Sequence, residues 1–105
     1  MNEQKNVLKK LLLVRLKNFK DSKQEQVKFI TFKWFNKVFV DVLKKEKDKD
    51  FVVCTCFDKT NNTVAYSFKF NINNFVEAEK FVDDIIIFIK PEHYKIIINN
   101  LLKCL

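Results

Sequence analysis

The period of the hydrophobic pattern changes twice along the chain, and this constrains the fold more than any other feature. Residues 2–20 repeat at helical spacing, with Leu8, Leu11, Leu12, Leu16 and Phe19 on one side and lysines on the opposite side. Residues 27–72 follow strand-like patterns, and residues 74–105 return to helical spacing. The pattern predicts a single α+β domain over residues 1–105: an N-terminal amphipathic helix, a four-stranded antiparallel meander and two C-terminal helices.

The middle of the chain divides into four short segments of aromatic and β-branched residues. We expect strands at residues 27–35, 38–43, 51–57 and 64–70. Asn36 and Lys37 are expected to form a two-residue hairpin turn, since the chain has no glycine and asparagine tolerates a positive φ. Short connections between successive strands favour antiparallel pairing. In the last strand we expect Val64, Tyr66, Phe68 and Phe70 to point inward.

Capping signals mark the two C-terminal helices. Asn74 followed by Glu77 has the spacing of a helix N-cap, and we expect an apolar stripe of Phe75, Ala78, Val82, Ile85 and Ile89 after it. Pro91 suits the first turn of another helix. The apolar stripe expected on that helix comprises Tyr94, Ile97, Ile98, Leu101 and Leu105.

The positive charge is concentrated in the first half of the chain. Residues 1–50 carry fourteen basic and seven acidic side chains, whereas residues 51–105 carry six of each. This balance favours a polyanionic partner such as nucleic acid or an anionic membrane surface. For the basic face of the N-terminal helix, plain solvation, phosphate contact and membrane contact all remain open.

Residue types that carry catalysis are scarce. There is one histidine, His93, and the absence of glycine excludes the usual phosphate-binding loops. We therefore expect no enzymatic activity, no cofactor and no metal. Cys54 and Cys56 fall on one face of a strand and are expected to be buried thiols rather than ligands, with only the distant Cys104 as a third sulfur.

Three cysteines do not suit a secreted disulfide framework, so we expect a reducing, cytoplasmic or nuclear location. No apolar run approaches the length of a transmembrane segment, and the charged N-terminus is unlike a signal peptide.

Lysines interleaved with aromatic residues are the main functional signal. Lys28, Lys33, Lys37 and Lys69 lie on expected strands that also carry Phe29, Phe32, Trp34, Phe35 and Phe39. Aromatic rings stack on unpaired bases while ammonium groups neutralise phosphates, so this pattern suits single-stranded DNA or RNA. Most of these rings are expected in the core. Phe35, beside the turn, and the out-of-phase Phe29 and Phe39 are the expected exceptions.

The segment from Asn36 to Val42 resembles the PUR repeats of the Pur-alpha family. It matches their Asn-Lys-led aromatic strand ending in Asp-Val, followed by a charged turn and an aromatic-led strand at Phe51. The helix ending at residues 81–89 is also similar, so the resemblance covers about residues 27–90. Whirly-like single-strand binders share the same strand-rich plan with a helix.

The resemblance implies a four-stranded sheet that pairs with a second copy by exchanging or packing helices, and single-stranded nucleic acid bound on the sheet. Carried over, Asn36 and Lys37 would contact the nucleic acid, and Phe39 occupies an aromatic position of the same strand. The chain departs from the family in three respects: it lacks the glycine-arginine-phenylalanine turn, it has Val38 where a basic residue follows Asn-Lys, and its N-terminal helix has no counterpart.

The leading hypothesis is a homodimeric single-strand binder that uses Lys28, Lys33, Phe35, Asn36, Lys37, Phe39 and Lys69. The rival hypothesis is a small protein-interaction module or inhibitor, such as an adaptor encoded by a phage or parasite, acting through its apolar helices and basic surface. Exposed rings clustered with lysines would favour the first. An exposed apolar groove without lysines would favour the second.

Overall fold

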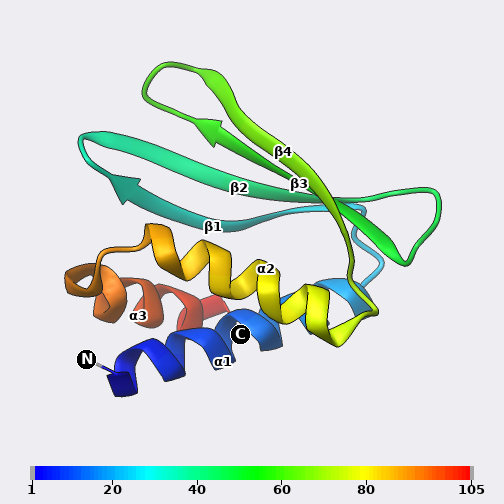
Figure 1. Cartoon of the computed structure of the whole chain (residues 1–105), viewed down its shortest axis with the longest axis horizontal. Helices are drawn as coiled ribbons and strands as arrows, with labels where there is room; N and C mark the ends of the chain where they lie inside the picture. Colours follow the sequence, from blue (N-terminus) through cyan, green and yellow to red (C-terminus); the bar gives the residue numbers. More distant parts are fainter. Residues whose placement is uncertain (1, 105) are drawn as a thin grey trace.

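A computed structural model describes residues 2–104 as one sheet covered on one face by helices (Figure 1). The elements in chain order are α1 (Asn2–Asp21), β1 (Gln26–Trp34), β2 (Lys37–Lys45), β3 (Phe51–Asp58), β4 (Thr63–Asn71), α2 (Phe75–Phe88), a 3-10 turn (Pro91–His93) and α3 (Tyr94–Cys104). The four strands pair antiparallel in the order β1-β2-β3-β4. The predicted α+β architecture is therefore confirmed.

The helices bury one face of the sheet and leave the other open (Figure 1). Val52, Cys54 and Cys56 of β3 point toward the helices and have no exposed surface, while the alternate residues of that strand are half-buried. On the helix side, α1 packs against both α2 and α3. Its predicted stripe is confirmed, since Leu8, Leu12, Leu16 and Phe19 are buried and Leu11 packs against them.

The β1–β2 turn lies one residue earlier than predicted. Trp34 pairs with Lys37, so Phe35 and Asn36 form the turn in place of Asn36 and Lys37. Phe35, rather than an asparagine, adopts the left-handed backbone, with φ of 54°. A positive φ at the first turn position matches the right-handed twist of a hairpin, and in a chain without glycine a phenylalanine takes that position.

An extra residue in β1 overturns the expectation for Phe29. Lys28 pairs with Val42 and Ile30 pairs with Asp41, which leaves Phe29 as a bulge. Both Phe29 and Ile30 then point to the core, and Phe29 is 1% exposed. The prediction that Phe29 escapes the core was therefore wrong, because simple alternation fails where a bulge intervenes.

A second irregularity affects β4. Cys56 pairs with Tyr66 and Phe57 pairs with Val64, which leaves Ala65 without a partner in β3. Val64 is 57% exposed, so its predicted inward orientation was wrong, whereas Phe70 is buried as expected. Tyr66 and Phe68 face the helix side but are only partly covered.

The start of α2 follows the sequence, whereas Pro91 begins the 3-10 turn that precedes α3 and not α3 itself. The side chain of Asn74 accepts a hydrogen bond from the Glu77 amide and thereby begins α2 as predicted. Phe75 is an exception to the expected stripe: it is 67% exposed because it is the first residue of the helix, beyond the edge of the core. On α3, Tyr94, Ile97 and Leu101 are buried, while Leu105 lies outside the described residues.

Within residues 2–104, none of the helices has the length and apolar character that crossing a membrane requires.

Candidate nucleic-acid interface

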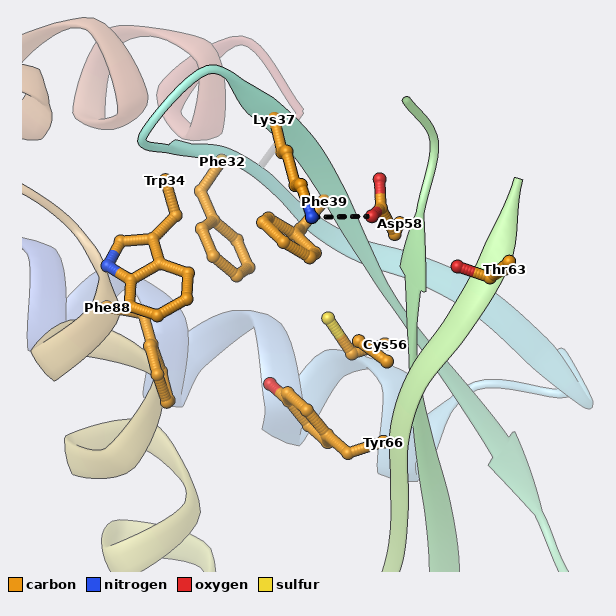
Figure 2. Close-up of a pocket in the computed structure, with 10 residues that line it drawn as sticks. Phe32, Trp34, Lys37, Phe39, Cys56, Asp58, Thr63, Tyr66 and Phe88 are labelled. Carbon is orange, nitrogen blue, oxygen red and sulfur yellow. Dashed lines mark ion pairs between the residues drawn. The ribbon is translucent and has the colours of Figure 1, made fainter. Parts of the chain in front are cut away.

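An aromatic pocket lies where the sheet overhangs the end of α2, next to the β1–β2 turn (Figure 2). Its volume is about 340 Å³. The residues that line it come from all four strands and from α2: Phe32, Trp34, Lys37, Phe39, Cys56, Asp58, Thr63, Ala65, Tyr66 and Phe88. We call this set the aromatic pocket. A cavity of this size that opens to solvent is within the usual range of small-ligand sites.

The ring faces in the aromatic pocket are held at several orientations. Trp34 meets Phe88 edge-on, with ring centroids 5.7 Å apart and planes at 87°. Tyr66 and Phe88 are nearly parallel, with centroids 6.4 Å apart. These contacts fix the rings relative to one another, so a planar ligand would contact aromatic rings whose orientations are already set.

Lys37 and Asp58 supply charge on one side of the pocket. The Lys37 ammonium lies 3.8 Å from Asp58 Oδ2 (Figure 2). Burial favours the neutral form of Asp58, but hydrogen bonds from Asn61 and from the Thr60 amide, together with Lys37, hold the pKa of the carboxyl below its ordinary value. The Asp58 carboxylate is thus held by hydrogen bonds from Thr60 and Asn61 of the β3–β4 turn. The Lys37 side chain is half exposed, and its ammonium group remains able to meet an anion.

A buried carboxyl lies behind the pocket wall. Asp41 of β2 has no exposed surface, and its Oδ1 accepts a hydrogen bond from the Tyr66 hydroxyl. Its Oδ2 has no hydrogen-bond partner among the described residues. Burial raises the pKa of Asp41 to about 6, although hydrogen bonds with Cys56 and Tyr66 oppose the shift.

The pKa values of the groups next to Asp41 shift in the same direction. Burial, reinforced by the charge of Asp41, raises the pKa of the Cys54 and Cys56 thiols and of the Tyr66 hydroxyl. Cys54 and Cys56 are buried, as predicted, and the raised pKa disfavours the reactive thiolate form. Residues 2–104 contain no group of three or more His, Cys, Asp or Glu side chains placed to hold a metal ion.

Two large rings at the turn are open to solvent. Phe35 is 72% exposed and Trp34 is 40% exposed, with their ring centroids 4.8 Å apart. The ammonium of Lys90, which follows α2, lies 5.9 Å from the centroid of the Phe35 ring. Together with Lys37, these residues place aromatic faces and positive charge at one end of the molecule. We call Trp34, Phe35, Lys37 and Lys90, with the aromatic pocket, the turn-end site.

The structure divides the predicted site residues between the two faces of the sheet. Phe35, Asn36 and Lys37 come together at the turn. Phe39 is only 8% exposed, so its expected escape from the core was wrong, although it lines the aromatic pocket. Lys28, Lys33 and Lys69 instead point to the open face. Their cross-strand partners on that face are Val42, Val38 and Val53, respectively.

Every charged side chain that the described strands place on the open face is a lysine. Lys44 joins Lys28, Lys33 and Lys69 there, because Lys44 and Lys69 both pair with Val53. Within the described strands, the acidic residues are Asp41 and Asp58, and both point to the helix side. A face with one sign of charge attracts a polyanion.

Sequence reasoning missed Trp34, Tyr66, Phe88 and Lys90 as site residues. Trp34 and Tyr66 were expected in the core. Phe88 lies at the last residue of α2, and Lys90 follows the helix, so their sequence neighbours gave no indication that they meet the β1–β2 turn. Only the packing of α2 against the sheet brings them there.

Comparisons of the chain with protein-family models, with curated proteins and with solved structures gave no match.

Proposed function

We propose that the protein binds single-stranded DNA or RNA at the turn-end site and is not an enzyme. The observation that carries the proposal is the exposed ring of Phe35, held on a left-handed backbone beside a pocket walled by aromatic rings. A non-glycine residue in this conformation is disfavoured, and an exposed phenylalanine forgoes burial. Unfavourable local conformations of this kind concentrate at functional sites.

Unpaired bases suit this arrangement better than duplex. A base can stack on Phe35 or Trp34, and a neighbouring base can enter the aromatic pocket, whose rings offer both faces and edges. Each stacked base contributes about 1–3 kcal/mol. In a duplex the bases are already stacked on one another, and these rings could not reach their faces.

Lysines on both sides of the turn supply the phosphate contacts. Lys37 and Lys90 lie next to the exposed rings, and Lys33 lies close by on the open face. A strand that crosses the turn can continue over the open face toward Lys28, Lys44 and Lys69. In this proposal, Lys28, Lys33 and Lys69 bind phosphate apart from the exposed rings of the turn, although the Lys69 ammonium lies 5.2 Å from the centroid of the Phe51 ring. The sequence had placed phosphate binding and base stacking together.

A fluorescence-anisotropy titration tests the proposal. Labelled single-stranded DNA, single-stranded RNA and duplex of about 20 nucleotides, longer than one binding module covers, are titrated at two salt concentrations. We expect tighter binding to at least one single strand than to duplex, and weaker binding at higher salt as counterions are released. Equal affinity for duplex, or binding to none of the three, would contradict the proposal.

Two phenylalanines provide a matched pair of variants. Phe35 and Phe75 are 72% and 67% exposed, but Phe75 lies at the start of α2, away from the turn-end site. We expect Phe35→Ala to weaken binding about 5- to 150-fold, the equivalent of one lost stacking contact, and Phe75→Ala to leave it unchanged. Equal losses of affinity in the two variants would show that the binding site is not at the turn.

A protein-interaction module is the second candidate, favoured by an apolar groove between β4 and α2. Lys80 and Asp84 are the charged residues in its lining, so it lacks the clustered lysines of the turn-end site.

A further inference from the structure

The two edges of the sheet are protected to different degrees. β1 carries the Phe29 bulge, and the Arg15 side chain of α1 bonds to the carbonyl oxygens of Lys28 and Phe29. β4 has β3 on one side, and no strand among residues 2–104 lies on its other side. Its bulge is at Ala65, so residues 66–70 form a regular segment. An unprotected edge of this kind is a template for pairing with another strand.

An apolar groove of about 520 Å³ adjoins this edge. Tyr66 and Phe68 line it from β4, and Phe81, Ile87 and Phe88 line it from α2. Ile87 is 75% exposed. The lining includes one lysine and one aspartate, so it is electrically balanced in a chain whose formal net charge is +7. A second copy of the chain would meet least repulsion at such a surface.

The exposed face of α2 is self-complementary. At 3.6 residues per turn, Val76, Lys80, Asp84 and Ile87 fall on one side of the helix. The order along that side is apolar, positive, negative, apolar. In an antiparallel pair of α2 helices centred near Val82, Val76 would face the partner's Ile87, and Lys80 would face the partner's Asp84. Val76 is 74% exposed, and the Lys80 and Asp84 side chains are 74% and 48% exposed.

The β4 edge has the same centre of symmetry. If two β4 strands pair antiparallel about Phe68, Tyr66 lies opposite the partner's Phe70, and Ser67 lies opposite the partner's Lys69. Aromatic pairs then occupy the helix side, and Lys69 avoids its own copy. The Phe68 ring lies 5.8 Å from the ring of Phe81, the residue before Val82. One two-fold axis therefore serves both the strand and the helix.

We propose that two copies of this chain associate through β4 and α2 about a two-fold axis beside Phe68. The two sheets join into one continuous antiparallel sheet, with the α2 helices side by side beneath it. This contact is isologous, so it closes after two copies. It does not rest on the proposed nucleic-acid binding. Tyr66 and Phe88 line both the aromatic pocket and the groove, but Trp34, Phe35, Lys37 and Lys90 of the turn-end site lie outside the dimer contact.

Sedimentation equilibrium of the full chain tests this interface. We expect the wild type to form a dimer, and Ile87→Asp to weaken the dimer at least about tenfold by placing a charge in the contact. Ile96→Asp is the matched control, since Ile96 is 62% exposed on α3, away from the proposed axis. A wild-type chain that stays monomeric up to about 1 mM, or equal effects of the two variants, would overturn the proposal.

Charge reversal gives a sharper test of the pairing. Lys80→Glu makes this face of α2 acidic and Asp84→Lys makes it basic, so each variant alone should be largely monomeric. Mixed together, the two variants should form a heterodimer, because every cross-axis pair is again of opposite charge. Circular dichroism checks that both variants fold. Failure of the mixture to associate, or undiminished homodimers of either variant, would overturn the antiparallel α2 pairing.

Discussion

The ring of Phe35 is exposed to water, and its backbone has a left-handed conformation that glycine adopts most easily. Its φ of 54° compares with 58° at Asn62 in the β3–β4 turn, where asparagine is well suited to the left-handed region. The sequence predicted an exposed Phe35 and a hairpin turn next to it, but placed the turn one residue too late, at Asn36 and Lys37. It did not predict that Phe35 would take the left-handed position, because the register of β1 against β2 decides this.

Replacing Phe35 with glycine should separate stability from function. We expect Phe35→Gly to leave the free energy of unfolding unchanged or to raise it by up to about 1 kcal/mol, since glycine adopts this φ without steric penalty. Binding to single strands should fall as far as in Phe35→Ala. Urea titration measures the first effect, with Asn62→Gly as the control at the same φ. A large loss of stability would mean that the ring supports the fold.

Asp41 should make stability depend on pH in an unusual direction. Its pKa is about 6 in the folded chain and about 4 when unfolded, so the folded state binds more protons between these values. Stability should therefore fall as the pH rises from about 4 to about 6, by roughly 2–3 kcal/mol.

Asp41→Asn should remove this dependence and be the more stable protein at neutral pH. Urea unfolding of both proteins across this range measures the difference, in which the contributions of other groups cancel. Parallel pH profiles would contradict the raised pKa of Asp41.

At the scale of elements, most of the predicted helices and strands follow from local sequence patterns. Each helix and strand could be located because its hydrophobic period and its caps lie within a few residues of sequence, as at Asn74. The bulges at Phe29 and Ala65 could not, because they are defined by which residue lies opposite in the neighbouring strand. The aromatic pocket was missed for a similar reason, since it needs Phe88 of α2 beside Trp34 of β1.

Arg15 should be the main link between α1 and the edge of the sheet. Its Nε donates to the Phe29 carbonyl oxygen at 2.9 Å, and its Nη2 donates to that of Lys28 at 2.8 Å. A lysine cannot reproduce this two-pronged geometry. We expect Arg15→Lys to lower the free energy of unfolding by about 1–2 kcal/mol in urea titrations. Lys17→Ala on the exposed side of the same helix should change it little, and equal losses would show that the link is unimportant.

At the scale of the whole molecule, the described strands place acidic residues on one side of the sheet only. The open face presents lysines, while the acidic residues within the described strands lie on the helix side. The sequence indicated an excess of positive charge in the first half of the chain, but it could not show that Lys69 joins Lys28 and Lys33 on one surface. That arrangement requires the complete sheet.

The salt dependence of binding should report how many phosphates the lysines of the open face neutralise. For a single strand, the slope of log K against log salt changes by about 0.7 for each phosphate neutralised. We expect Lys33→Gln to reduce the magnitude of the slope by about this amount, and Lys95→Gln on α3 to leave it unchanged. Anisotropy titrations at several salt concentrations measure both slopes. An unchanged slope for Lys33→Gln would show that the open face is not part of the binding site.

The single tryptophan offers the most direct test of the central claim, because Trp34 lies within the turn-end site and no label is needed. Unlabelled single-stranded oligonucleotide is added while tryptophan fluorescence is recorded. If bases stack at the turn, the emission should be quenched to saturation with the affinity that anisotropy reports, and Phe35→Ala should shift the curve to higher concentration. Binding by anisotropy with no change at Trp34 would place the nucleic acid elsewhere on the molecule. Absence of both signals would contradict nucleic-acid binding altogether.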